Sequence, residues 1–93
     1  MEGCLNAYET NSLEMAVVVE FSIIPMGKGA SVSRLIALAV KELEKRGVKH
    51  VTTPMCTIIE EESLEKALEY IRIAHEAVMR AGVERVITII KVD

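Results

Sequence analysis

Hydrophobic and polar residues alternate along this chain with two different periods, and the order of those periods predicts the architecture. The segment from Ala16 to Ile24 is mostly apolar and β-branched, and neighbouring side chains such as Phe21 and Ser22 fall on opposite sides. A period of two is typical of a strand with two different faces. We expect Pro25 to end this strand, because proline lacks the N–H that a ladder requires.

Two later segments carry apolar residues at helical spacing, three and four positions apart, with charged residues between them. The first is predicted to begin after Ser31, which is suited to be its N-cap, and to end before Gly47. The second is predicted to begin after Ser63 and to end before Gly82 by the same two signals. Both segments are therefore expected to be amphipathic helices with one buried stripe.

Three further apolar segments, 48–53, 57–60 and 83–92, are predicted strands. The stretch that opens at Gly47 resembles the one that opens at Gly82, since glycine, two valines and a threonine recur at equal spacing. The element order is then β-α-β-β-α-β. This order predicts an α+β fold, the ferredoxin-like split βαβ arrangement, with a four-stranded antiparallel sheet and two helices on one face.

The first 14 residues are polar and show neither period, so we interpret 1–14 as a disordered lead and 15–93 as the domain. Because Met15 immediately precedes the first strand, it is also a candidate for the true start of the protein. A chain of 93 residues is expected to form a single domain.

Charge and cysteine content narrow the classes of function. The chain has 14 acidic and 11 basic side chains, which argues against binding of nucleic acid. No apolar run approaches the roughly 20 residues that span a membrane. Two cysteines without an export signal favour free thiols and a cytoplasmic location. Neither cysteines nor histidines show metal-ligand spacing, and no cofactor is expected.

In the predicted fold the helices cover one face of the sheet, and the other face mixes aliphatic residues with carboxylates. Aliphatic residues are expected there at Val18, Ile24, Ile58 and at least one of Ile87 and Ile89. A contiguous apolar patch usually marks an interface, which favours a homodimer or homotetramer. The alternative is a scatter of tolerated surface residues.

Glu20 and Glu60 are expected on the two central strands, on the same side of the sheet. A carboxylate among apolar residues is costly unless it meets a cation or a hydrogen-bond donor. Each could therefore hold a cationic or amine-bearing ligand between subunits, or could pair with Arg or Lys of a partner chain. The sequence leaves both interpretations open.

Four stretches of the chain resemble one known family. They are Val19–Ser33 (VEFSIIPMGKGASVS), Thr53–Glu60 (TPMCTIIE), Ala74–Val78 (AHEAV) and Arg85–Asp93 (RVITIIKVD). Together they are similar to the small thiamine-binding family of archaeal and bacterial proteins, over residues 15–93. One position departs from that family's pattern, because Cys56 stands where the family has a turn glycine.

The resemblance implies a ferredoxin-like fold that associates through its sheets into dimers or tetramers. It implies binding of thiamine or of its hydroxymethylpyrimidine part, at the sheet face and its rim, without catalysis. The ligand-binding positions implied in this chain are Glu20, Ser22, Ser31, Ser33, Met55, Thr57 and Glu60.

Two other functions stay open at this stage. The chain could be a structural module that only associates through its sheet. It could also be a small enzyme with Glu20 or Glu60 as general base, although only the fold would support that. The loop from Gly27 to Ser33 precedes a helix and could hold an anion, or it could be an ordinary turn. His75 lies on an apolar stripe, where a hydrogen-bonded structural role is favoured over a ligand role.

Overall fold

The computed structural model describes residues 16–27, 31–53 and 55–93, and the described residues form four strands and two helices. In chain order these are β1 (Val17–Met26), α2 (Val32–Lys45), β2 (His50–Thr52), β3 (Thr57–Glu61), α3 (Leu64–Met79) and β4 (Arg85–Val92). The sheet order is β2-β3-β1-β4, and each neighbouring pair is antiparallel. The predicted ferredoxin-like fold is thus confirmed. The predicted lead, residues 1–14, and the proposed start at Met15 lie outside the described residues.

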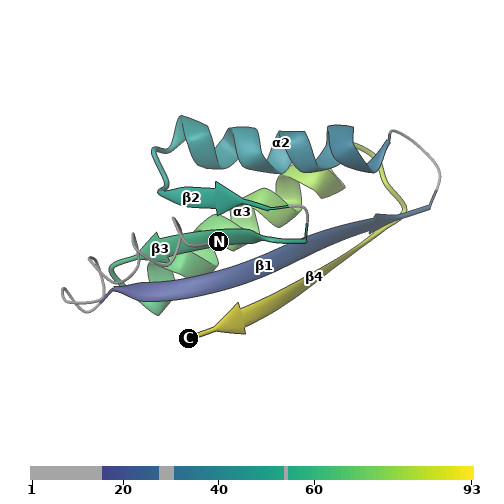
Figure 1. Cartoon of the computed structure of the whole chain (residues 1–93). Coiled ribbons are helices and arrows are strands. Elements are labelled where there is room, and N and C mark those ends of the chain that lie inside the picture. The colour runs from purple at the N-terminus through teal and green to yellow at the C-terminus, as the bar shows by residue number, and fades with distance from the viewer. Residues whose placement is uncertain (1–15, 28–30, 54) are drawn as a thin grey trace.

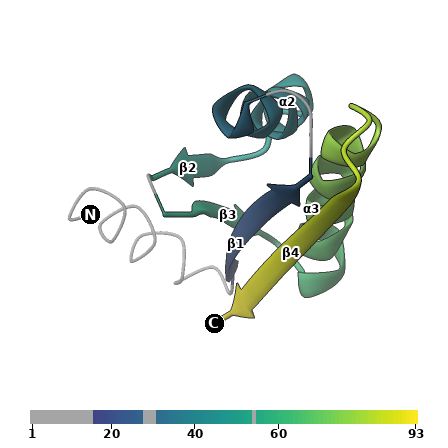
Figure 2. The same ribbon diagram turned by 90° about the vertical axis from the view of Figure 1, so that its right-hand side faces the viewer.

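Both helices pack on the same face of the sheet (Figures 1 and 2). The side chains of Val19, Phe21 and Ile23 on β1 point toward them and are buried. Alternation along the strand therefore orients β1 as the sequence predicts. The other buried members of this core are Leu35, Ala39, Leu43, Val48, Ile59, Ala67, Ile71, Ala74 and Val78.

The helix ends follow the predicted signals, with one difference. The Ser63 hydroxyl accepts a hydrogen bond from the Lys66 N–H at 3.1 Å and caps α3. Ser31 occupies the equivalent position before α2 with an extended backbone, but its side chain makes no capping bond. Gly47 and Gly82, with φ of 67° and 90°, follow the helices in the left-handed region.

The prediction that Pro25 ends the first strand is wrong. Strand β1 runs through Pro25 to Met26, and these residues lie opposite Val86 and Arg85 of β4. Peptide groups along a strand point alternately to its two neighbours. The nitrogen of Pro25 points to the side of β3, which has already ended, so the missing N–H breaks no ladder bond.

The strands differ in length more than the sequence predicts. Strand β2 has only three residues, His50–Thr52, where the hydrophobic pattern predicts a strand over 48–53. Strand β1 has ten residues and β4 has eight. Figure 1 shows β1 and β4 running on past the ends of β2 and β3. The half of the sheet beneath the start of α2 is therefore narrower than the other half.

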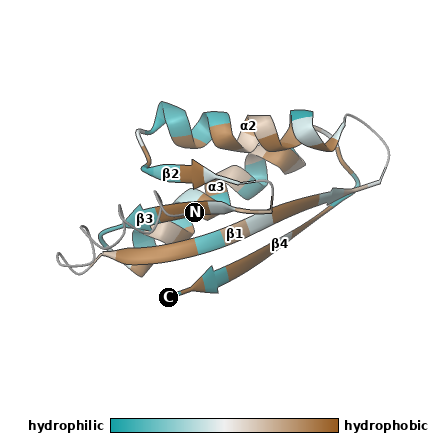
Figure 3. Cartoon of the chain, in the orientation of Figure 1, coloured by the Kyte–Doolittle hydropathy of each residue, from teal (hydrophilic) through white to brown (hydrophobic). Residues whose placement is uncertain are grey.

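The face of the sheet away from the helices is mixed, as predicted. The register places Val18 opposite Glu60 and Glu20 opposite Ile58, so both carboxylates lie on the central strands and on this face. Figure 3 shows hydrophobic residues along most of β1 and β4. Ile24 and Ile89 are 41% and 51% exposed on this face, whereas Ile58 is 7% exposed. The exposed apolar patch thus lies over β1 and β4 rather than over β3.

Candidate ligand-binding site

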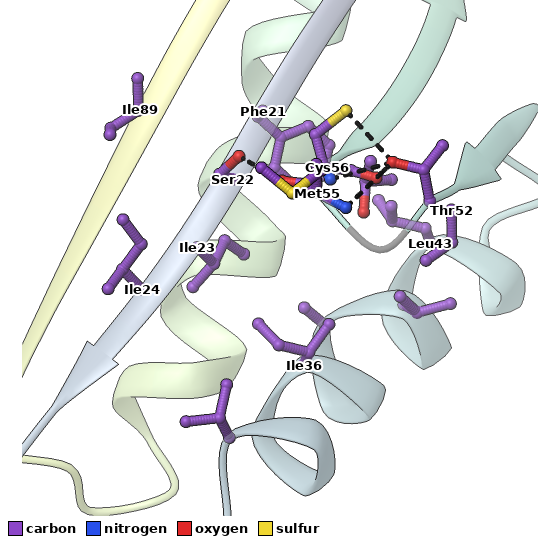
Figure 4. Close-up of a pocket in the computed structure, with 15 residues that line it drawn as sticks. Phe21, Ser22, Ile23, Ile24, Ile36, Leu43, Thr52, Met55, Cys56 and Ile89 are labelled. Carbon is purple, nitrogen blue, oxygen red and sulfur yellow. Dashed lines mark hydrogen bonds between the residues drawn. The ribbon is translucent and has the colours of Figure 1, made fainter. Parts of the chain in front are cut away.

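A cavity of about 400 Å³ lies between α2, the second half of β1 and the turn that joins β2 to β3 (Figure 4). Its position follows from the strand lengths. The last residue of β1 that pairs with β3 is Phe21, opposite Thr57, and β1 continues alone on that side to Met26. The first turns of α2 thus pass over a part of the sheet from which β2 and β3 are missing, and the space beneath them is not filled.

The walls of the cavity are largely apolar. One side is a stripe on α2, and the opposite wall belongs to β1, with Ile89 of β4 beside it (Figure 4). Among the described residues that line the cavity, none is charged. A concave, mostly apolar space of this size is suited to an uncharged ring or a short hydrocarbon group. The apolar lining residues of β1, α2 and β4 are Phe21, Ile23, Ile24, Val32, Ile36, Ala39, Val40, Leu43 and Ile89.

The polar wall is the turn between β2 and β3, and Thr53 holds it in shape. The Thr53 hydroxyl accepts hydrogen bonds from the N–H groups of Met55 at 3.2 Å and Cys56 at 3.1 Å. It donates to the Cys56 carbonyl at 3.0 Å, and the Thr53 N–H donates to the same carbonyl at 2.8 Å. A threonine that bonds to the backbone two and three residues on stabilises a tight turn.

The turn is also tied to β1. The Ser22 hydroxyl donates to the Met55 carbonyl at 3.1 Å, which connects the two walls of the cavity (Figure 4). The Cys56 sulfur lies 3.6 Å from the Thr53 hydroxyl oxygen, and this thiol is half-buried at the cavity wall. The sequence therefore presents a thiol at the position where the resemblance predicts a glycine.

The structure brings together only some of the residues predicted to bind a ligand. Ser22, Met55 and Thr57 line the cavity. The other four predicted residues, Glu20, Glu60, Ser31 and Ser33, are not among its lining residues. Ser31 and Ser33 are exposed at the start of α2.

The two carboxylates lie on the face away from the helices, and each has a lysine of the same chain beside it. The Glu20 carboxylate is 3.7 Å from the Lys91 ammonium, and both side chains are well exposed. The Glu60 carboxylate is buried and lies 3.2 Å from the Lys49 ammonium. The sequence left open a cation from a partner chain, and the structure supplies one from within the chain.

Sequence reasoning missed most of the helical wall. Val32, Ile36 and Val40 recur every four residues, and the pattern assigns them to the buried stripe of a helix. In the structure they lie on the flank of that stripe and line the cavity. The hydrophobic pattern of a helix does not show whether the space between that helix and the sheet is packed with side chains or left as a cavity.

Comparison with known proteins agrees with the resemblance in the sequence. The model of the family of thiamine-binding proteins matches residues 19–93. This chain belongs to that family. A relative from Methanothermobacter thermautotrophicus, known as a UPF0045 protein, is 38% identical over 78 residues, which are 83% of this chain and 79% of the relative.

Solved structures show the same fold. A Bacillus cereus domain of unknown function, DUF77, is 31% identical with a TM-score of 0.77, over 84% of this chain and 74% of that one. A Thermotoga maritima protein, described as a candidate for thiamine biosynthesis or salvage, has a TM-score of 0.71 at 18% identity. That match covers 84% of this chain and 82% of the Thermotoga chain, and it supports the fold alone.

The described residues show neither a metal cluster nor a membrane-spanning helix. Over 16–27, 31–53 and 55–93, no group of three or more His, Cys, Asp or Glu side chains could hold a metal ion. Within these ranges, too, no helix is long and apolar enough to cross a membrane.

Proposed function

We propose that this protein binds thiamine, or the hydroxymethylpyrimidine part of it, in the cavity beneath α2, and that it does so without catalysing a reaction. The observation that carries the proposal is a cavity of about 400 Å³, whose described lining residues are all uncharged, in a member of the thiamine-binding family. The pyrimidine of thiamine is a flat, uncharged, methylated ring. Such a ring suits the space between the helical stripe of Ile36 and Val40 and the strand wall of Phe21 and Ile23.

The cationic part of thiamine would lie outside this apolar space. Ser22, Ile24 and Ile89 line the cavity and belong to the face of the sheet away from the helices. The cavity therefore extends around the edge of β1 toward that face. Glu20 precedes Ser22 by two residues on the same side of the strand, about 7 Å away. We propose that its carboxylate attracts the thiazolium of a ligand whose pyrimidine lies under α2.

The ion pair that Glu20 makes in the free protein would not prevent this. The carboxylate and the Lys91 ammonium are 3.7 Å apart, and their side chains are 41% and 76% exposed. Exposed pairs of this kind contribute little to stability and rearrange at low cost. A permanent cation next to Glu20 could therefore replace the lysine.

The proposal is tested by filling the cavity. Ala39 is buried and lines the cavity, whereas Ala37 lies exposed on the same helix. We expect Ala39→Leu to reduce thiamine affinity at least about tenfold, because its side chain would occupy space that the pyrimidine needs, and Ala37→Leu to bind as wild type. Val40→Phe narrows the same cavity from a second position.

Isothermal titration with thiamine and with hydroxymethylpyrimidine measures these affinities, and circular dichroism confirms that each variant is folded. Wild-type protein that binds neither compound at millimolar concentration would refute the proposed function. Folded Ala39→Leu and Val40→Phe proteins that both bind as tightly as wild type would place the ligand elsewhere.

We further propose that the protein associates with itself through the exposed patch over β1 and β4. Ile24 and Ile89 are 41% and 51% exposed there, and neighbouring exposed aliphatic residues favour an interface. Multi-angle light scattering at micromolar concentration is expected to show a dimer or tetramer, and Ile89→Glu should shift it toward the monomer. A wild-type monomer would contradict this association without affecting the proposed ligand.

A further inference from the structure

The peptide groups of β1 point alternately to its two neighbouring strands, and one contact shows which residues point which way. The Asp93 N–H donates to the Val18 carbonyl at 3.0 Å, so Val18 presents its peptide groups to the β4 side. By the same alternation Ser22 and Ile24 also face β4, and Phe21 and Ile23 face the side of β3. The N–H and C=O of Ile23 thus point toward the open end of β3.

At Ile23 the ladder with β3 has already ended. The last pair of that ladder is Phe21 with Thr57, the first residue of β3. The residues that precede Thr57 belong to the turn between β2 and β3. The N–H groups of Met55 and Cys56 bond to the Thr53 hydroxyl. The Met55 carbonyl accepts from Ser22, and the Cys56 carbonyl accepts from Thr53. Because these hydrogen bonds are made elsewhere, Met55 and Cys56 do not extend the ladder to Ile23.

Pro25 supports this orientation independently. It is the next residue of β1 whose peptide nitrogen faces the side of β3, and it has no N–H to offer. A proline inside a strand is tolerated where no neighbouring strand requires its N–H. Among the described residues, neither peptide group of Ile23 pairs with β3 or with the turn. This edge of β1 therefore presents one adjacent donor and acceptor, the N–H and C=O of Ile23. Ile23 also lines the cavity beneath α2.

We propose that this edge of β1 at Ile23 recognises the aminopyrimidine ring of the ligand, an inference that rests on the proposed function. The Ile23 N–H would donate to the ring nitrogen beside the exocyclic amine, and the Ile23 carbonyl would accept from that amine. The ring thus replaces the donor and acceptor that the next residue of a longer β3 would supply in an antiparallel pair. The pairing also satisfies peptide groups that the apolar wall would otherwise leave costly to bury.

Such a subsite would distinguish ligands by their hydrogen-bonding pattern rather than by their shape. Oxythiamine carries a carbonyl in place of the amine, so its neighbouring ring nitrogen becomes a donor and the pattern is inverted. Pyrithiamine keeps the aminopyrimidine and changes only the cationic ring. A site built to hydrogen-bond one pattern rejects the other because its own polar groups are then left unsatisfied. We expect oxythiamine to bind at least about tenfold more weakly than thiamine, and pyrithiamine to bind within about threefold of it.

Amide hydrogen exchange measured by NMR tests the geometry directly on the full chain. In the free protein the Ile23 amide should exchange at least about tenfold faster than the amides of Ser22 and Ile24, which pair with β4. Saturating thiamine should slow the exchange at Ile23 at least about tenfold. The Val19 amide, which lies in the ladder with Ile59, should change little and serves as the control.

The outcomes separate this inference from the proposed function. If thiamine binds while oxythiamine binds equally well, or while the Ile23 amide is unaffected, the edge does not recognise the ring and the inference is overturned. The proposed function would then survive. If thiamine, pyrithiamine and hydroxymethylpyrimidine all fail to bind, the proposed function fails and this inference fails with it. Slowed exchange at Ile23 together with selective loss of oxythiamine affinity supports both.

Discussion

The two halves of the chain follow the same order of strand, helix and strand, yet they pack differently beneath their helices. In the second half α3 packs against β1, β3 and β4 and buries Ala67, Ile71, Ala74 and Val78 almost completely. The His75 ring nitrogen Nδ1 lies 2.5 Å from the Thr88 hydroxyl and ties α3 to β4. In the first half α2 packs on α3 and β1, and a cavity remains below it.

Part of the difference lies in the strand that follows each helix. Strand β4 has eight residues and completes the sheet under α3, whereas β2 has three residues and stops under the last turns of α2. Two similar βαβ units therefore give one filled half and one half with a cavity. In this fold, strands of unequal length leave room for a candidate binding site without any change in the order of elements.

The largest difference between the two halves is expected in how much a core truncation lowers the free energy of unfolding. Ile71 is 3% exposed within the filled half, and Ile71→Ala should lower the free energy of unfolding by about 2–5 kcal/mol. Ile36 lies against the cavity and is only partly buried, so Ile36→Ala should cost clearly less. Urea unfolding followed by circular dichroism measures both. Equal losses would mean that the space below α2 is packed as tightly as the space below α3.

A second contrast concerns chemical access to the cavity. Cys56 lines the cavity wall, so N-ethylmaleimide should modify it and then block thiamine binding. The experiment uses a Cys4→Ala background, which leaves Cys56 as the single thiol. Saturating thiamine should slow the modification at least about tenfold by mass action, and Cys56→Ala should still bind. Modification at the same rate with and without bound thiamine would show that the ligand does not cover the Cys56 thiol.

A smaller effect is expected at the rim of the cavity. Glu20→Gln should weaken thiamine binding about twofold to fivefold, because the exposed carboxylate contributes only a screened attraction to the thiazolium. Neutral hydroxymethylpyrimidine should bind unchanged. The exposed Glu62→Gln variant, which removes the same charge at the start of α3, serves as control. An equal loss for both ligands on titration would point instead to an interaction between Glu20 and the pyrimidine amine.

The smallest effects are expected from the surface ion pairs, which do not distinguish the two halves. A hydrogen bond from Arg46 lowers the pKa of Glu42 on α2, and a hydrogen bond from Arg72 lowers the pKa of Glu69 on α3, both below 4.5. Carboxylates with lowered pKa stabilise the folded state above pH 4.5, and this contribution is lost as the pH falls through their folded-state pKa.

Both carboxylates lie at the protein surface, where solvent screens their ion pairs, so the contribution is expected to be small in both helices. Arg46→Ala and Arg72→Ala should each change the melting temperature slightly at pH 7 and less at pH 3. A large change for Arg72→Ala alone would show that surface charge, besides core packing, distinguishes the two halves.

Much of the architecture could be predicted from the sequence, because its signals are local. The alternation around Phe21, the helical stripes and the Ser63 cap depend on residues a few positions apart, and the structure confirms each of them. The side of β1 on which Glu20 lies follows from the same alternation. Four such short stretches resemble the thiamine-binding family, and the family model confirms the resemblance.

Only the tertiary structure decided where the cavity lies and what surrounds it. The end of β3 relative to β1 depends on the turn that Thr53 closes and on the register of two strands from different parts of the chain. The continuation of β1 through Pro25 and the pairing of Glu20 with Lys91 depend on the same register. The alternation of apolar and polar residues indicates which face of a strand is buried, but it does not indicate where a neighbouring strand ends. For this reason the sequence predicts Val32, Ile36 and Val40 as core residues, whereas in the fold they line a cavity.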